Sequence, residues 1–116
     1  MKMLLALAVV ALFGAQDSTI YAPGNGVSLP EVVRQVGPQY TSEAMQNRIE
    51  GKVGLDVVVL SDGKVGDVTV VQSLDKIYGL DDNAVKAMKQ WEFKPGMKDG
   101  KAVAVRIHVD MAFTLK

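Results

Sequence analysis

The segment AVAVRIHVDMAFTL, residues 102–115, carries the clearest structural signal in the chain. Apolar and polar side chains alternate along its whole length, which predicts a β-strand with one buried face and one solvated face. At this length it exceeds the usual strand of about 5–6 residues. Its apolar positions are Val103, Val105, Ile107, Val109, Met111, Phe113 and Leu115.

A β-hairpin is predicted upstream of this strand. Residues 52–60 alternate in the same way, and residues 65–72 are rich in β-branched side chains. Asp62 and Gly63 lie between them, and Asp-Gly predicts a tight type I′ turn. Together with residues 102–115 the hairpin would form a three-stranded antiparallel sheet. Part of the long last strand would then lack a partner, and unpaired strand backbone is a template for another chain.

One helix is predicted before the hairpin. Thr41 or Ser42 can cap its N-terminus, and apolar residues at helical spacing carry it to about Ile49. Gly51 follows at the place where a left-handed residue commonly ends a helix.

A second helix is predicted between the hairpin and the last strand. Asp81 or Asp82 can cap it, and it should run to about Gln90, before Pro95 stops any helix. Trp91 is expected in the core. The order helix, hairpin, helix, strand therefore predicts a small α+β domain over residues 38–116, with a three-stranded antiparallel sheet packed by two helices.

The N-terminal region has a different composition. Lys2 precedes an unbroken apolar run from Met3 to Phe13, which is the layout of a secretory signal peptide. The run is shorter than the roughly 20 residues that span a bilayer, so residues 1–15 are interpreted as a cleaved signal, with a retained short anchor or a buried core segment as alternatives. Residues 16–37 are rich in turn-forming residues and are interpreted as a linker.

The charge balance and residue counts exclude several function classes. Among 116 residues there are 13 basic and 13 acidic side chains and no cysteine. A neutral chain is not a nucleic-acid binder that works by neutralising phosphates. Without cysteine there is no disulfide, thiolate metal site or thiol catalysis. No serine lies in a nucleophile elbow, and one histidine with scattered aspartates is a poor metal site, so we expect no enzyme, metal or cofactor.

Several short motifs, in this order and spacing, resemble the C-terminal domain of TonB, the energy transducer of the Gram-negative envelope. The resemblance covers about residues 27–116. The motifs are Pro38-Gln39-Tyr40, Arg48-Ile49-Glu50-Gly51-Lys52-Val53, Asp62-Gly63-Lys64-Val65, Leu80-Asp81, Trp91-Glu92-Phe93-Lys94-Pro95-Gly96 and Asp99-Gly100-Lys101-Ala102-Val103.

The resemblance implies a periplasmic domain that binds the extended TonB box of an outer-membrane receptor by strand addition, in energy-dependent transport across the membrane. Such binding agrees with a long strand that has spare backbone hydrogen-bonding groups. The alternative is a module that pairs with itself through the last strand, as a homodimer, or with another envelope protein, without transducing energy.

Candidate site residues fall into two groups. Gln39 and Tyr40 are implied by the resemblance as partner contacts, although Tyr40 can equally pack at the start of its helix. Arg106, His108 and Asp110 form a polar row on the last strand, which is either a contact surface or an ordinary solvated face. The residues expected to be structural are Gly51, Asp62, Gly63, Trp91, Phe93 and Pro95.

The chain also departs from a full transducer. The stretch from Gln16 to Gly37 has 22 residues and spans about 75 Å at full extension, a poor bridge between two membranes. We therefore expect an exported, periplasmic protein, with residues 3–15 as a candidate tether to the inner membrane. Direct coupling to an inner-membrane proton-motive complex is not expected.

Overall fold

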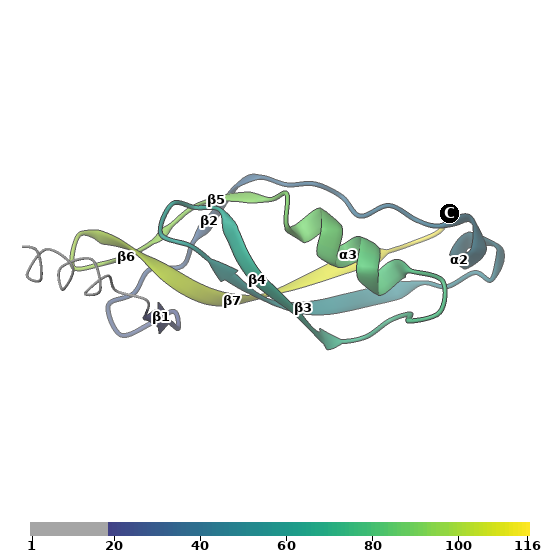
Figure 1. Cartoon of the computed structure of the whole chain (residues 1–116), viewed down its shortest axis with the longest axis horizontal. Helices are drawn as coiled ribbons and strands as arrows, with labels where there is room; N and C mark the ends of the chain where they lie inside the picture. The colour runs from purple at the N-terminus through teal and green to yellow at the C-terminus, as the bar shows by residue number, and fades with distance from the viewer. Residues whose placement is uncertain (1–18) are drawn as a thin grey trace, which may run out of the picture.

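The computed structural model describes residues 19–116, which form one α+β domain (Figure 1). The signal peptide or anchor predicted for residues 1–15 lies outside these residues. No helix within residues 19–116 has the length and apolar character needed to cross a bilayer. The elements are β1 (Ile20–Tyr21), β2 (Glu31–Arg34), α2 (Ser42–Gln46), β3 (Gly51–Val59), β4 (Val65–Gln72), α3 (Leu80–Met88), β5 (Glu92–Lys94), β6 (Gly96–Lys98) and β7 (Lys101–Phe113).

The main sheet has five strands, so the predicted three-stranded antiparallel sheet is wrong in strand number and in direction. Its order is β1-β7-β3-β4, with β6 paired to the start of β7. The antiparallel β3–β7 pair runs from Gly51 opposite Phe113 to Val59 opposite Val105. The extra strands are β6, which forms a hairpin with β7, and β1, which joins β7 in parallel. Three central strands were thus predicted, and the two short strands beside them were missed.

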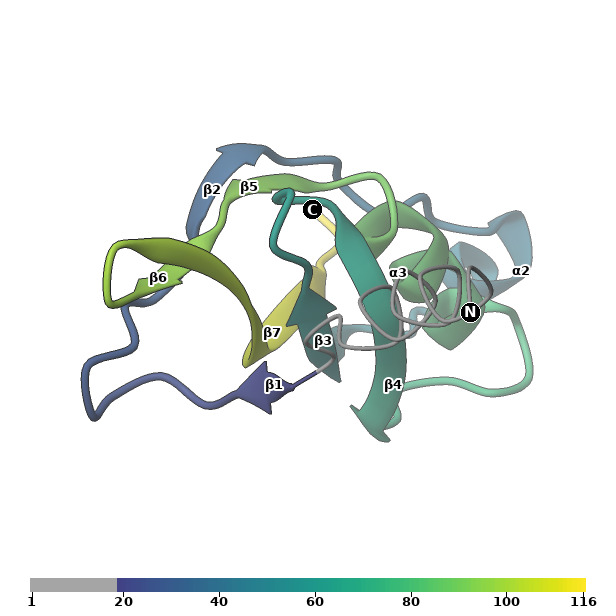
Figure 2. The ribbon, with the colours of Figure 1, turned by 60° about the vertical axis from the view of Figure 1, so that its left-hand side comes forward.

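A separate two-stranded sheet pairs β2 with β5, seen side by side in Figure 2. Val32 lies opposite Phe93, and the carboxylate of Glu92 lies 3.5 Å from the guanidinium of Arg34. Both β1 and β2 belong to the stretch interpreted as a linker. The described part of residues 16–37 therefore contributes strands to both sheets.

The β3–β4 hairpin forms, but its turn is not the type I′ turn predicted from Asp62 and Gly63. A type I′ turn needs positive φ at both central residues. Asp62 does not have it, since the described non-glycine residues with positive φ are Asn25, Arg48 and Asp99. Instead the N–H of Gly63 donates to the carbonyl of Leu60, and Gly63, with φ 87°, is the one residue of this turn that has positive φ. This geometry is a three-residue loop with a glycine bulge, and the Asp62 carboxylate accepts the backbone N–H of Lys64 at 2.9 Å.

The first helix is shorter than predicted. Thr41 caps α2, since its hydroxyl oxygen accepts the N–H of Ala44 at 3.1 Å. The helix ends at Gln46, and Arg48 takes the left-handed conformation with φ 53°. Gly51 does not end the helix as predicted, because the chain has already reversed at Arg48; Gly51 instead opens β3.

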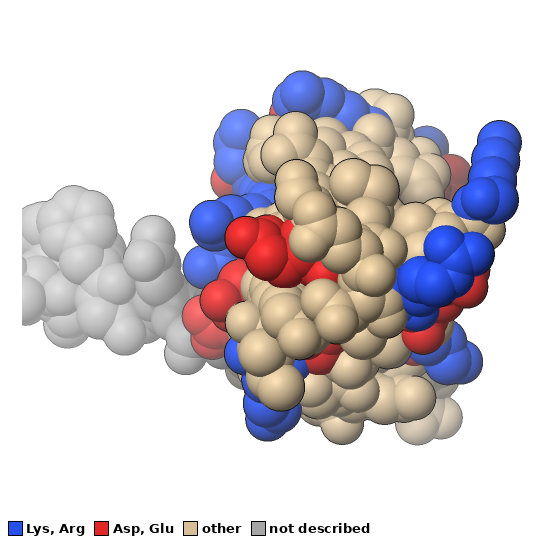
Figure 3. Space-filling view, turned by 90° about the vertical axis from the view of Figure 1, so that its right-hand side faces the viewer, with Lys and Arg blue, Asp and Glu red and all other residues tan. Residues whose placement is uncertain are grey.

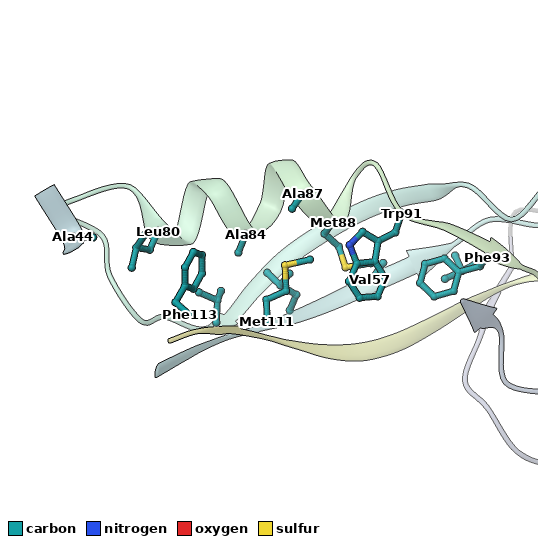
Figure 4. Packing of buried hydrophobic residues seen from close by; sticks show 13 residues of the cluster. Ala44, Val57, Leu80, Ala84, Ala87, Met88, Trp91, Phe93, Met111 and Phe113 are labelled. Atoms are coloured by element: carbon teal, nitrogen blue, oxygen red, sulfur yellow. The ribbon is translucent and has the colours of Figure 1, made fainter. Parts of the chain in front are cut away.

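α3 covers one face of the sheet and supplies four of the thirteen residues of the core cluster. Figure 4 shows its small and apolar side chains pointing at Met111 and Phe113 of β7 and at Val57 of β3. The alternation predicted for β7 appears in its burial from Val105 to Phe113, whereas β3 is also buried on its other face at Val58, which is 4% exposed. The core-side residues Val53, Leu55, Val57, Val59 and Val105 are all fully buried. The helix residues that pack on them are Leu80, Ala84, Ala87 and Met88.

Trp91 and Phe93 close the core where the chain leaves α3. They are 7% and 6% exposed, and their ring centres lie 6.0 Å apart. The indole Nε1 of Trp91 donates to the carbonyl of Val36 at 2.8 Å. Pro95 separates β5 from β6, so the chain turns from the small sheet into the large one at this point.

Two buried aspartates organise the loop before α3, and the sequence reading missed this role. The predicted caps do not form: the N-cap is Gly79, and Asp81 lies inside the helix. The Asp81 carboxylate instead accepts the hydroxyl of Ser73 at 2.5 Å and the backbone N–H groups of Leu74 and Asp75 at 2.9 Å each. Asp75 accepts the N–H groups of Ile77, Tyr78 and Leu80.

These hydrogen bonds set the protonation of both aspartates. Burial alone would raise the pKa of Asp81, but the N–H groups of Asp75 and Leu74 and the hydroxyl of Ser73 outweigh it and hold the pKa below its usual range. Burial and backbone N–H groups oppose each other in the same way at Asp75, whose pKa is also lowered. Carboxylates with lowered pKa stabilise the fold above their unfolded pKa, and this contribution is lost as the pH falls through the folded pKa.

Replacing Asp81 with alanine is expected to lower the free energy of unfolding by about 2–4 kcal/mol, because it leaves several donors without an acceptor. Urea denaturation at neutral pH measures the loss, and Asp82→Ala is the matched control because Asp82 is exposed on the same helix turn. The difference in free energy of unfolding between the two variants should narrow below pH 4, because the Asp81 carboxylate of the control variant then becomes protonated. Equal stability of both variants at neutral pH would contradict this role of Asp81.

Candidate functional site

The outer edge of β7 is the candidate site. One edge of β7 pairs with β3 from Val105 to Phe113, and on the other edge β1 pairs only with Ala104 and Val105. Within residues 19–116, no strand pairs with the remaining outer edge from Arg106 to Phe113. We call this backbone the open edge. Its N–H and C=O groups are available for hydrogen bonds to an added strand.

The open edge is held by a well-filled core on one side of the sheet. Met111 and Phe113 are 3% and 2% exposed, and Ile107 and Val109 pack partly against the same core. A strand fixed in this way keeps its backbone extended before any partner arrives, so little conformational entropy is lost on binding.

The polar row predicted on this strand lies on the face of the sheet turned away from α3. Arg106, His108 and Asp110 are all exposed there. His108 lies between two carboxylates: its Nδ1 is 3.2 Å from Asp56 Oδ1, and its Nε2 is 2.7 Å from Asp110 Oδ1. Lys52 Nζ lies 3.3 Å from the second oxygen of Asp110.

Cross-strand register explains this cluster. Asp56 of β3 lies directly opposite His108, and Gly54 lies opposite Asp110. A side chain at Gly54 would meet the His108 ring, since its Cβ would lie 3.2 Å from the ring carbon Cε1. Glycine therefore leaves the space in which the imidazole reaches both carboxylates. The sequence analysis did not identify Lys52 and Asp56 as part of this cluster, because their position beside His108 and Asp110 follows only from the β3–β7 register.

The contacts within this cluster shift the pKa values of His108 and Asp110. Hydrogen bonds to Asp56 and then Asp110 raise the pKa of His108, because both ring nitrogens can donate only when the imidazole is protonated. The hydrogen bond with His108 and, to a smaller extent, the one with Lys52 lower the pKa of Asp110. Four charged side chains on this face therefore pair with one another: Lys52, Asp56, His108 and Asp110.

We expect the His108 imidazole to titrate above 6.5, its ordinary pKa. A raised histidine pKa stabilises the fold below the unfolded pKa, and this contribution is lost as the pH rises through the folded value. NMR titration of the ring carbons measures the pKa directly. Replacing Asp56 and Asp110 together with asparagine should return it toward 6.5; a wild-type pKa at or below 6.5 would contradict the described contacts.

Arg106 differs from its neighbours in the row. No ion-pair partner is found for its guanidinium among residues 19–116. It adjoins the end of β1 and begins the open edge. It is therefore the charge in this row that an incoming acidic side chain could meet without breaking an existing pair.

Gln39 and Tyr40 do not join this row. The Tyr40 hydroxyl donates to the carbonyl of Ile49 at 2.6 Å, and its ring meets Phe113 edge-on at 5.3 Å between centres. Phe113 points into the core, so Tyr40 lies on the other side of the sheet from Arg106 and His108. The Gln39 carbonyl accepts the side-chain amide of Asn83 on α3. The five predicted contact residues are therefore split between the two faces of β7.

The surface is not dominated by one sign of charge on the end that carries α2 and the C-terminus. Figure 3 shows acidic and basic side chains in small groups around a broad uncharged area. This distribution agrees with the neutral balance of the sequence and does not favour a polyanionic partner on this face.

Comparison with known proteins gives the family. The family model described as the Gram-negative bacterial TonB protein C-terminal matches residues 36–115. The chain is 35% identical over 85 residues to protein TonB of Vibrio cholerae, covering 73% of this chain and 34% of that protein. It is 34% identical over 79 residues to protein TonB of Escherichia coli, covering 67% of this chain and 32% of that protein. The chain thus spans about a third of the length of these relatives.

The fold agrees with this match. The solution NMR structure of the Pseudomonas aeruginosa TonB C-terminal domain superposes with a TM-score of 0.57 at 24% identity, covering 86% of this chain and 99% of that one. Sequence and fold point the same way, and the chain belongs to the TonB C-terminal domain family.

Proposed function

We propose that this chain binds an extended peptide by adding it as a strand to the open edge of β7. The observation that carries the proposal is the unpaired outer edge from Arg106 to Phe113, on a strand whose other edge is fully paired with β3. In strand addition the main-chain hydrogen bonds provide affinity, and side chains at alternate positions provide specificity.

We propose further that the peptide is the TonB box of an outer-membrane receptor. Membership of the TonB C-terminal family supports this partner, and energy-dependent transport across the outer membrane is the process it would serve. The domain would then act in the periplasm, with residues 1–15 directing its export.

Arg106 is proposed as the side chain that selects the peptide. His108 and Asp110 are already paired with each other and with Asp56 and Lys52, so a partner gains little from them. An acidic side chain placed opposite Arg106 would gain a charge-assisted contact at the rim of the new strand pair.

Calorimetric titration with a synthetic receptor TonB-box peptide tests this function. Wild type should bind, and Arg106→Glu should weaken binding about fivefold or more, which corresponds to about 1 kcal/mol. Lys86→Glu makes the same charge change on α3, away from the open edge, and should bind like wild type. No binding at millimolar peptide, or equal weakening by both variants, would contradict the proposal.

A second candidate is pairing between two copies of the chain. It is favoured by the outer edge of β4, which also has no strand partner among the described residues and carries Val71 at 51% exposure. Two such edges on one sheet permit edge-to-edge association. A dimer in analytical ultracentrifugation at micromolar concentration, together with no peptide binding, would favour this candidate over the first.

A further inference from the structure

The N-terminal strand β1 lies on the same edge of β7 that the proposed function uses. Ile20 pairs with Ala104 and Tyr21 with Val105, in parallel, on the side opposite β3. Figures 1 and 2 both place β1 beside the first half of β7. The first two positions of the outer edge are therefore already occupied by the chain itself.

Side chains hold β1 there only lightly. Ile20 faces a hollow on the solvated side of the sheet that is also lined by Val58, Leu60 and Ala104. It remains 41% exposed, whereas Val58 beneath is 4% exposed. The ring of Tyr21 lies 5.9 Å from Lys98 Nζ, a contact of modest strength at an accessible site.

The sequence prevents β1 from covering more of the edge. Pro23 comes two residues after Tyr21, and proline has no N–H to continue a strand ladder. The chain then turns at Gly24, whose N–H and C=O both bond to Val27 at 3.0 Å, and Ser28 is bound to Met97 of β6. β1 is thus a two-residue strand tethered close to its site by an ordered loop.

We propose that β1 is a displaceable occupant of the peptide-binding edge and competes with the partner strand for Ala104 and Val105. This inference rests on the proposed function and adds a regulatory step to it. A tethered segment competes at a high effective concentration, yet two residues provide few hydrogen bonds. A peptide that extends past Arg106 toward Lys101 must displace β1, so its apparent affinity is reduced by the fraction of molecules in which β1 is docked.

The test uses the full chain and a receptor TonB-box peptide long enough to cover residues 104–113. The variant Ile20→Asn/Tyr21→Pro removes the apolar contact and one backbone donor of β1. Ile20→Asn alone is the milder version. Ile77→Asn is the control, because Ile77 is 83% exposed in the loop before α3. Calorimetry gives the affinity, and amide hydrogen exchange reports whether β1 is docked.

We expect the double variant to bind the peptide about 5- to 10-fold more tightly than wild type, and Ile20→Asn to fall between them. Ile77→Asn should match wild type. In wild type, adding peptide should speed amide exchange at Ile20 and Tyr21, because β1 is released.

The remaining outcomes separate the two proposals. Equal or weaker binding by the β1 variants, with unchanged exchange at Ile20 and Tyr21, would overturn the competition while leaving strand addition in place. Failure of every variant and of wild type to bind the peptide would overturn the proposed function, and the competition with it.

Discussion

Replacing Gly63 with alanine is expected to lower the free energy of unfolding by about 3 kcal/mol or more, because its Cβ would make the shortest contact of any described glycine. Gly63 has φ 87°, and a Cβ there would lie 2.0 Å from the carbonyl oxygen of Phe93. The atom in the way is backbone, held by the bond from the Phe93 N–H to the Gly63 carbonyl at 2.8 Å. It cannot turn aside as a flexible side chain would.

Gly100→Ala is the matched control for this variant. Gly100 has a similar φ, 77°, but nothing lies within 4 Å of the position of its Cβ. Its replacement should lower the free energy of unfolding by only about 1–2 kcal/mol, the strain of a left-handed conformation with a side chain. Urea denaturation of both variants measures the difference. Equal losses would show that the contact between the β3–β4 turn and β5 does not fix the turn.

Trp91→Ala should lower the free energy of unfolding by about 3–5 kcal/mol, because it removes the largest side chain of the core and leaves a cavity. The indole also loses its hydrogen bond to the Val36 carbonyl, which ties the segment before α2 to the exit of α3. Domains of this size are stable by about 5–15 kcal/mol, so this variant should lose a large fraction of the free energy of unfolding.

Trp91→Phe separates the two contributions. It keeps an aromatic ring beside Phe93, whose centre lies 6.0 Å away, but it lacks the Nε1 donor. We expect thermal unfolding to place it between wild type and Trp91→Ala. A Trp91→Ala variant within 1 kcal/mol of wild type would contradict the role of Trp91 in the core.

The long strands could be predicted because their signal is repeated many times. β3 and β7 pair over nine residues, and each buried position adds to the alternation. Burial dictates this pattern directly, so it can be read without knowing any partner. The two helices were predicted for the same reason, although their ends were not.

The short strands could not be predicted because they carry no repeat. β1 has two residues, and β5 and β6 have three each. Their existence depends on neighbours distant in sequence, such as Ala104 for Ile20 and Val32 for Phe93. Tertiary pairing of this kind overrides local preference.

Loop chemistry was misread where a residue has two possible roles. Asp81 at the start of a helix suggests an N-cap, yet its carboxylate turns back to hold residues 73–75. Gly51 suggests a helix end, yet Arg48 adopts the left-handed conformation first. Sequence shows which residues can take such roles, whereas the path of the preceding loop selects among them.

The candidate site was predictable in part. The length of the last strand indicated spare backbone groups, and the structure shows an open edge from Arg106 to Phe113. The network of His108 with Asp56 and Lys52 could be predicted only by someone who already knew the β3–β7 register. The pairing of β1 with Ala104 and Val105 could not be predicted, because β1 lies in a segment that was interpreted as a linker.

Strand addition to the open edge is tested most directly by NMR of the isotope-labelled chain with an unlabelled receptor TonB-box peptide. We predict intermolecular nuclear Overhauser effects between the peptide backbone and residues 106–113, with amide exchange slowed at alternate residues of this edge. Slowed exchange along the outer edge of β4, peptide contacts confined to α3, or no intermolecular signal at saturating peptide would contradict the account.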